Sequence, residues 1–183
     1  PTEMTELLVA GAAAMDKARS AQGPTLALSA VTLHQPVLRP PKILAVGLNY
    51  KDHIEETGLD TPKFPMFFNK QCTASHGPYD PIHLPRVSTK LDYEGELGFI
   101  IGRRCRHVPR DRAHEVIAGY VVCNDVSVRD WQMRSQTFTL GKSFDTHSPF
   151  GPWMVTSDEV PDPHALDLKT WVNGELRQDS NTR

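Results

Sequence analysis

The stretch KLDYEGELGFIIG, residues 90–102, alternates like a β-strand and yet carries three acids. Successive strand residues point to opposite faces, so Asp92, Glu94 and Glu96 are expected to share one face. Acids are poor strand formers, and like charges placed side by side repel one another. The stretch therefore needs compensation, from solvent, from basic neighbours or from a bound cation.

Two interpretations of these acids remain open on the residues alone. One is a solvated strand face. The other is a site for a hard cation such as Mg²⁺ or Ca²⁺, which prefers oxygen ligands and could take two of them from residues i and i+2 of a strand. A third carboxylate is available at Asp125, within the apolar stretch VVCNDVSV (residues 121–128), where an unpaired charge is costly. Asp125 could equally be satisfied by backbone amides or by Arg129.

A second candidate group lies in NYKDHIEETG, residues 49–58. His53 and Glu56 are three residues apart, so a helix would place them on one face. A histidine oriented by a carboxylate is an arrangement suited to a general base, although a surface His–Glu pair is the commoner case. We expect this short polar segment to be a helix capped by Asn49, ended by Gly58, and mobile as a lid.

The remaining candidates are cationic or amide side chains in polar stretches. Lys142 stands in GKSFDTHSPFGPW (residues 141–153), where it is either a solvated surface charge or, beside a metal, a partner for a substrate carboxylate. Arg129 and Gln132 follow Asp125 and could bind an anion and a carbonyl. The alternative for both is an ordinary surface at the start of a helix.

Composition limits the class of protein. The 183 residues are 39% hydrophobic and 23% charged, which is typical of one soluble globular domain. A net charge of −2 gives no basic field for nucleic acid, and no apolar run approaches the ~20 residues of a membrane span. The three cysteines have no zinc spacing, which indicates reduced thiols. We therefore expect no nucleic-acid or membrane partner and a cytoplasmic protein, or a mitochondrial-matrix one in a eukaryote.

Local patterns predict a loop-rich fold that is mainly β with a few short helices. Fifteen prolines argue against a helical bundle. Helices are expected at 3–20, after Asn49, and at 109–120. Strands are expected at 26–33, 42–48, 64–70, 90–102 and 120–128, and Asn173-Gly174 is a hairpin turn.

Six of these stretches occur in the order found in the fumarylacetoacetate hydrolase family, which the chain resembles from residue 42 to its end. They are VGLNYKDHIEE, PMFFNK, GPYDPIHLP, DYEGELGFIIG, GYVVCNDVSVRDWQ and GKSFDTHSPFGPWMV. The resemblance is greatest to the branch that acts on small 2-oxo acids. It implies a mixed β-sandwich roll, with an N-terminal segment at 1–41 and a catalytic domain at 42–183. Members continue past the VNGE motif, so the resemblance implies a roll that is incomplete at its C-terminal end.

The resemblance also implies roles for the candidate residues. Glu94, Glu96 and Asp125 fall on the positions that bind Mg²⁺, with Mn²⁺ or Ca²⁺ as alternatives, while Asp92 matches no ligand position. His53 and Glu56 fall on the catalytic base and its partner.

Arg129, Gln132 and Lys142 fall on the substrate-binding positions, and Lys142 is also expected to take part in catalysis. The implied protein is a homodimeric, metal-dependent hydrolase that cleaves a C–C bond in a β-diketo acid. The alternatives are an oxaloacetate decarboxylase or tautomerase, a hydroxymuconate-type isomerase, and a non-catalytic degenerate member.

Overall fold

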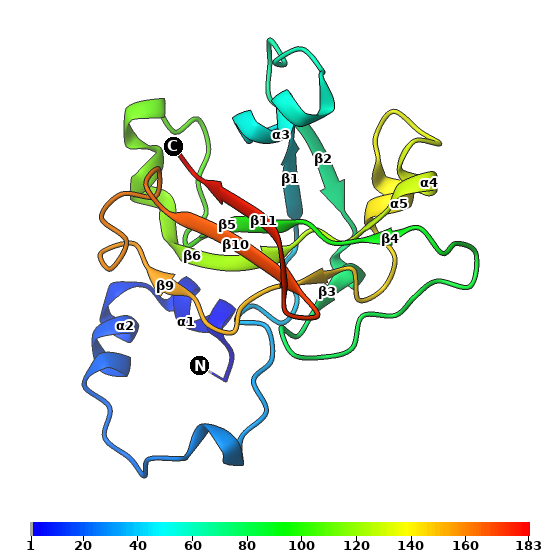
Figure 1. The fold of residues 1–183 in the computed structure, drawn as a ribbon. Coiled ribbons are helices and arrows are strands. Elements are labelled where there is room, and N and C mark those ends of the chain that lie inside the picture. Colours follow the sequence, from blue (N-terminus) through cyan, green and yellow to red (C-terminus); the bar gives the residue numbers. More distant parts are fainter. Residues whose placement is uncertain (1) are drawn as a thin grey trace.

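The structure is a computed structural model that describes residues 2–183, and its regular elements are mainly short strands with a few short helices, as expected (Figure 1). The α-helices are α1 (Met4–Ala10), α2 (Ala12–Arg19), α3 (Lys51–Thr57), α4 (Arg129–Gln132) and α5 (Thr139–Lys142). The 3-10 helices are η1 (Leu28–Ala30), η2 (Cys72–Ala74) and η3 (Arg110–Val116). The strands are β1 (Ile43–Gly47), β2 (Met66–Lys70), β3 (Ser75–His76), β4 (Leu91–Asp92), β5 (Gly95–Ile101), β6 (Ile117–Asn124), β7 (Ser127–Val128), β8 (Ser148–Pro149), β9 (Val155–Thr156), β10 (Asp167–Val172) and β11 (Glu175–Asn181).

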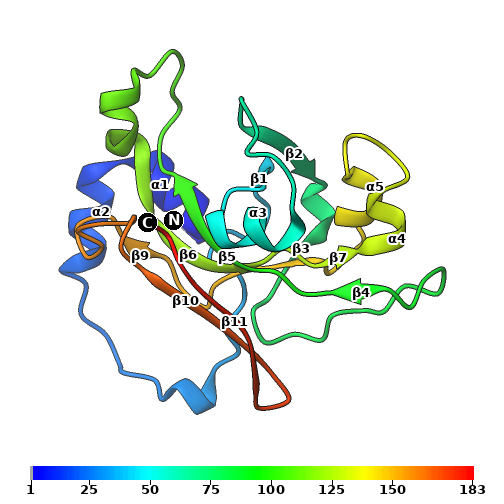
Figure 2. The ribbon, with the colours of Figure 1, turned by 45° about the horizontal axis from the view of Figure 1, so that its top comes forward.

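An antiparallel sheet in the order β5–β6–β9 lies at the centre of the fold. The pairs β1–β2, β4–β7 and β10–β11 are also antiparallel, whereas β3 and β8 are parallel. The β10–β11 hairpin crosses β5 and β6, and β10 contacts β5 (Figure 1). The β1–β2 hairpin stands beside this sheet and carries α3 in the connection between its strands, as the turned view shows (Figure 2).

The acidic stretch is interrupted rather than continuous. Leu91–Asp92 pairs with β7, and the chain re-enters a ladder only at Gly95, where β5 pairs with β6. The opposing segment is interrupted at the same level, because β6 ends at Asn124 and β7 begins at Ser127. The Asp125 amide donates to the Glu94 carbonyl across this gap, over 2.8 Å. The prediction of one strand over 90–102, and of another over 120–128, was therefore wrong where the carboxylates lie.

The buried apolar cluster includes a residue of β6 in the central sheet. Val37, Val121 and Phe150 are its buried members, and Met4 and Met154 pack against them. Fully burying a side chain of this size contributes roughly 1.5–3 kcal/mol to stability. Because Met4 and Val37 belong to this cluster, residues 1–41 contribute to the same core as the rest, and their division from 42–183 stays a prediction.

Several local predictions at the N-terminal end were wrong. The expected helix at 3–20 is two helices, because Gly11 takes a positive φ of 76° that ends α1 and starts α2. The expected strand at 26–33 is an exposed loop with the 3-10 turn η1. Its alternation reflects no buried face.

Two further boundaries differ from expectation. Residues 110–116 form a 3-10 helix, and the chain already enters β6 at Ile117, so Gly119 lies within a strand and ends no helix. Helix α3 begins after Tyr50, with no side-chain cap from Asn49, although Gly58 ends it in the left-handed region as expected.

Three elements agree with the sequence. Strands β1 and β2 form at 43–47 and 66–70. Asn173 and Gly174 both have positive φ, 52° and 83°, which suits a tight two-residue hairpin.

Among residues 2–183, no helix is long and apolar enough to cross a membrane.

Candidate functional site

Lys142 lies at the centre of a buried group of charges. It ends α5 with only 2% of its surface exposed, and its Nζ donates to Glu94 Oε2 over 2.7 Å and to Asp125 Oδ2 over 2.8 Å. A Cβ on the preceding Gly141 would collide with the backbone of Gln132, so glycine allows α5 to approach α4 closely. The interpretation of Lys142 as a solvated surface charge was wrong.

Asp125 is held from both sides. Lys70, at the end of β2, donates to Asp125 Oδ1, while Lys142 donates to Oδ2. Burial alone would raise the pKa of Asp125, but the ammonium groups of Lys70 and Lys142 outweigh it and lower that pKa below its usual value. Asp125 is therefore ionised at neutral pH, although it is buried.

Arg129 is engaged mainly by protein carboxylates. Its Nε and Nη2 donate to Asp92 Oδ2 over 2.8 and 2.7 Å. Its Nη1 donates to Glu94 Oε1 and, over 3.1 Å, to Gln132 Oε1. Because most of the guanidinium donors are already used, Arg129 positions Glu94 in this structure and leaves little capacity for a substrate carboxylate.

Glu96 differs from the other carboxylates of the group. Burial, together with the negative charges of Glu94 and Asp125, raises the pKa of Glu96 to about 8, despite a hydrogen bond from Asn49. Three carboxylates of the group pair with three basic side chains: Asp92, Glu94 and Asp125 with Lys70, Arg129 and Lys142. Glu96 forms no ion pair with these basic side chains, so the effect of burial is not fully offset and Glu96 retains a proton near neutral pH.

The predicted metal ligands Glu94, Glu96 and Asp125 thus influence one another, but they do not form a ready-made ligand cage. In residues 2–183, no group of three or more His, Cys, Asp or Glu side chains is arranged to hold a metal ion. The Lys142 ammonium lies between two of the three carboxylates. The donor chemistry nevertheless fits a hard cation, because all three side chains offer carboxylate oxygens.

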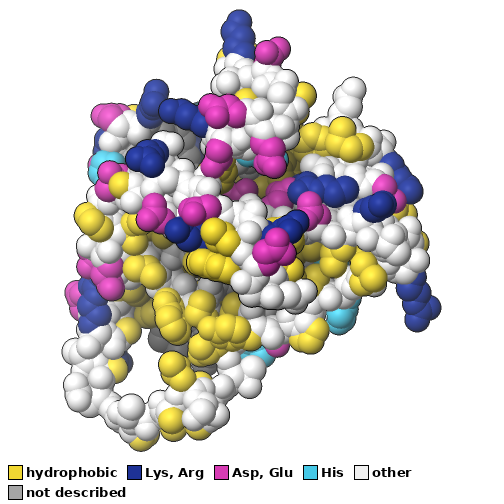
Figure 3. Space-filling view, in the orientation of Figure 1, with side chains coloured by type: hydrophobic (Ala, Val, Ile, Leu, Met, Phe, Trp, Pro, Cys, Tyr) yellow, Lys and Arg dark blue, Asp and Glu magenta, His cyan; other side chains and the backbone are white. Residues whose placement is uncertain are grey.

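The proposed base lies outside this buried group. His53 and Glu56 are both exposed on α3. The backbone amide of His53 donates to Asp52 Oδ1, and its carbonyl accepts from Thr57 Oγ1. Acidic side chains gather on α3 and around the hollow beneath it (Figure 3). The residue before α3 reaches the site, because the Tyr50 hydroxyl accepts from the Leu97 amide over 3.4 Å and interacts with Glu96.

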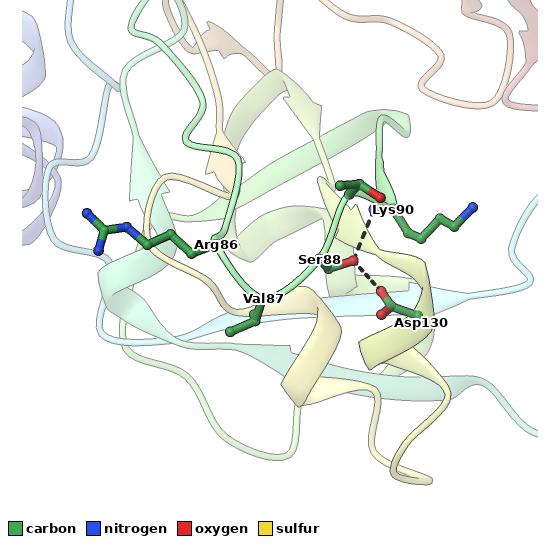
Figure 4. A pocket seen from close by; sticks show the side chains of 6 residues that line it. Arg86, Val87, Ser88, Lys90 and Asp130 are labelled. Atoms are coloured by element: carbon green, nitrogen blue, oxygen red, sulfur yellow. Dashed lines mark hydrogen bonds between the residues drawn. The ribbon is translucent and has the colours of Figure 1, made fainter.

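Two shallow hollows lie away from the carboxylates. One, of about 410 Å³, is formed by residues 86–90 and Asp130, where Ser88 Oγ donates to Asp130 Oδ1 over 2.6 Å (Figure 4). The other, of about 460 Å³, lies between α3 and the ends of β10 and β11. Neither is lined by Glu94, Glu96, Asp125 or Lys142, so neither is the site that the sequence predicts.

Sequence reasoning missed two residues of the group and left one undecided. Lys70 and Tyr50 were within recognised stretches but received no role, and Asp92 matched no ligand position. The available signal for Lys70 was its strand position, because residues two apart share a face and Lys70 therefore lies on the same face of β2 as Phe68. Nothing in the local pattern distinguishes Tyr50 from an ordinary surface tyrosine.

Comparison with known proteins adds to this geometry. Residues 42–183 match the family profile described as fumarylacetoacetate (FAA) hydrolase C-terminal. The mitochondrial oxaloacetate tautomerase fahd2 of Xenopus laevis is 42% identical over 187 residues, covering 100% of this chain and 59% of that protein. The chain thus spans about three fifths of the length of the curated relatives it matches.

Two solved structures have a similar backbone. A 5-carboxymethyl-2-hydroxymuconate delta-isomerase from Mycobacterium smegmatis has a TM-score of 0.77 and 44% identity, over 88% of this chain and 62% of that one. A fumarylacetoacetate hydrolase from the psychrophile Exiguobacterium antarcticum has a TM-score of 0.83 and 38% identity, over 98% of this chain and 64% of that one. The similarity therefore extends over both the fold and the stretches that form the buried group.

Proposed function

The chain belongs to the fumarylacetoacetate hydrolase family, and on that basis we propose that the protein containing it enolises small 2-oxo acids, with keto–enol tautomerisation of oxaloacetate as the leading reaction. The relatives support this choice over hydrolysis, because several at 42–46% identity are named oxaloacetate tautomerases. Hydrolysis of a C–C bond, which was expected first from the sequence, becomes the second candidate. Tautomerisation of oxaloacetate, which was an alternative there, becomes the first.

One observation of the structure carries the proposal. A fully buried lysine, Lys142, bridges the buried Asp125 and the partly buried Glu94, and a second buried lysine, Lys70, supports Asp125. Taking such charges out of water is expensive, and a purely structural core would be as stable with apolar side chains. A buried set of opposite charges suits a small anionic substrate whose reaction moves charge within the molecule.

The residues of the chain divide the work in this proposal. Lys142 would donate a hydrogen bond to a substrate oxygen when its bonds to Glu94 and Asp125 rearrange, and Gln132 would orient a carbonyl. His53, assisted by Glu56, would take the proton from the carbon next to the keto group. Arg129 would keep Glu94 in place.

The metal remains part of the proposal. Glu94, Glu96 and Asp125 would hold Mg²⁺, or alternatively Mn²⁺ or Ca²⁺, once Lys142 moves and Glu96 gives up its proton. A bound divalent ion would supply Lewis-acid stabilisation of the negative charge that develops on the keto oxygen.

A direct assay tests the proposed reaction. Oxaloacetic acid dissolved freshly as the enol should lose its enol absorbance faster with the intact protein and Mg²⁺ than in buffer alone. Lys142→Met should return the rate to that of buffer, and Lys63→Met, a change at an exposed lysine, should not. An unchanged rate with intact protein and Mg²⁺ would reject tautomerisation of oxaloacetate.

The lid gives a further prediction. Helix α3 is short, buries no residue completely and is joined to the fold through β1 and β2. Its amides should therefore exchange with solvent rapidly in the free protein and more slowly when Mg²⁺ and oxalate, a non-reacting dicarboxylate, are present. Hydrogen-exchange mass spectrometry measures this, with β6 as the internal control. Equal exchange in both states would mean that α3 is a fixed surface helix.

The second candidate is hydrolysis of a β-diketo acid such as an acylpyruvate. The spacing of His53 and Glu56 on α3 favours it, because such a pair could activate water. Loss of acylpyruvate absorbance in the same preparation would identify this activity. A non-catalytic member of the family would show neither activity and would have no need of a divalent ion.

The setting of the protein is also proposed rather than established. Homodimer formation is retained as a proposal, which light scattering on the intact protein tests. The vertebrate relatives are named as mitochondrial proteins, which supports the mitochondrial alternative over the cytoplasm if this protein comes from a eukaryote.

A further inference from the structure

Lys70 is a buried lysine that the proposed reaction leaves without a role. It is 3% exposed and ends β2, where it pairs with Ile43 of β1. Its Nζ donates to Asp125 Oδ1 and, over 3.1 Å, to the carbonyl of Val126. Both partners lie in the gap between β6 and β7. A single ammonium group therefore holds two groups of this gap, one of which is the Asp125 carboxylate.

The two buried lysines are not equivalent. Lys142 is shared between Glu94 and Asp125 and lies over the ring of Phe68, with Nζ 5.1 Å from its centroid. Lys70 has no carboxylate partner besides Asp125 among its contacts in residues 2–183, and its second bond is to the backbone next to that residue. Lys142 can therefore keep one carboxylate partner while it releases the other, whereas both hydrogen bonds of Lys70 are to residues 125 and 126.

Lys70 connects the hairpin that carries α3 to the Asp125 segment. Strand β2 is the return strand of the hairpin that carries α3. The bond from Lys70 therefore joins the base of that hairpin to Asp125. Burial lowers the pKa of Lys70 and the Asp125 charge opposes this effect, as expected for an ammonium group kept inside the fold by its carboxylate partner.

We infer that Lys70 is a positioning residue: its hydrogen bond fixes one oxygen of Asp125, so that the carboxylate is oriented for a divalent cation. The inference rests on the proposed function, because it takes Asp125 as a metal ligand. Groups that hydrogen-bond to a metal ligand orient it, and their loss typically lowers metal affinity or activity by about 10–100-fold. Lys70 would act through Asp125 and would not touch the substrate.

Metal affinity tests this inference without depending on turnover. Mn²⁺ binding to the intact protein can be followed by the electron paramagnetic resonance signal of the free ion. Lys70→Met should weaken binding by about 10–100-fold, Lys70→Gln should weaken it less, and Lys70→Arg, which keeps the charge and the donors, should restore most of the loss. Lys63→Met is the matched control, because Lys63 is exposed in the same β1–β2 connection.

Activity then separates positioning from catalysis. Raising Mn²⁺ to saturation should return kcat of Lys70→Met towards that of the unchanged protein, whereas Lys142→Met should stay inactive at every Mn²⁺ concentration. If Lys70→Met does not fold, as judged by its thermal melt, the comparison of Lys70→Gln with Lys70→Arg decides.

The two possible failures give different results. Equal Mn²⁺ affinity in all folded Lys70 variants would overturn the inference and leave the proposed function intact. Absence of Mn²⁺ binding in the unchanged protein would overturn the proposed metal site and, with it, the inference.

Discussion

Replacing Glu94 with Gln is expected to abolish divalent-metal binding and activity together. Both carboxylate oxygens of Glu94 accept hydrogen bonds from cations, Oε1 from Arg129 and Oε2 from Lys142. An amide has only one oxygen, so its NH₂ group must point at one of these cations in either orientation. The variant would lose a negative charge and leave either the buried Lys142 or the partly exposed Arg129 facing a donor. Breaking a buried pair in this way typically costs roughly 3–5 kcal/mol.

The measurements are calorimetric titration with Mg²⁺ and the enol assay on the same preparation. Glu175→Gln serves as the control, because Glu175 is exposed on the β10–β11 hairpin and pairs only with Arg177 among the residues described. A Glu94→Gln variant that kept its metal affinity but lost activity would show that Glu94 is not a ligand. One that kept both would remove Glu94 from the site altogether.

The sequence predicted the residues of the buried group better than the backbone that holds them. The alternation at 90–102 suggested a single acidic strand face, and the structure instead has β4 and β5 separated by a break at Glu94. Alternation reports which side of a strand a residue would take, and it contains no information on where two neighbouring strands separate. That break depends on the Asp125–Glu94 backbone bond, which joins residues distant in the sequence.

The sequence contained even less indication of which charged side chains pair with one another. The stretch around Lys142 is rich in small polar residues, which is typical of an exposed loop, and its burial depends on the close approach of α5 to α4 at Gly141. Arg129 was predicted to bind substrate, yet Asp92 and Glu94 use most of its donors. Such choices depend on distances between distant segments, which no local pattern specifies.

Local backbone chemistry explains which elements were predicted well. The Asn173-Gly174 turn and the Gly58 helix end both need residues that tolerate positive φ, and the sequence supplies them at the required position. Gly11 carried the same information, but its place within an apolar helical pattern concealed it. In the structure, the conformation of Gly11 divides the two helices despite the continuous apolar periodicity.

Replacing His53 with Ala is expected to lower the rate of proton transfer by about 10²–10⁴-fold while leaving metal affinity nearly unchanged. His53 is exposed on α3, and the hydrogen bonds found for it involve its own helix, so its removal leaves Glu94, Glu96 and Asp125 undisturbed. The enol assay measures the first effect, and Mg²⁺ titration measures the second. His114→Ala, at an exposed histidine of η3, is the matched control.

The combination of the two measurements assigns the role of His53. Loss of rate with metal affinity retained would identify a base delivered by α3, and Glu56→Gln should then reproduce part of the loss, because Glu56 would orient the imidazole. Loss of metal together with rate would make His53 a ligand or a structural support for the site. A full rate without His53 would place the base elsewhere, and the buried lysine Lys142, already bonded to Glu94 and Asp125, would then become the first residue to test for proton transfer.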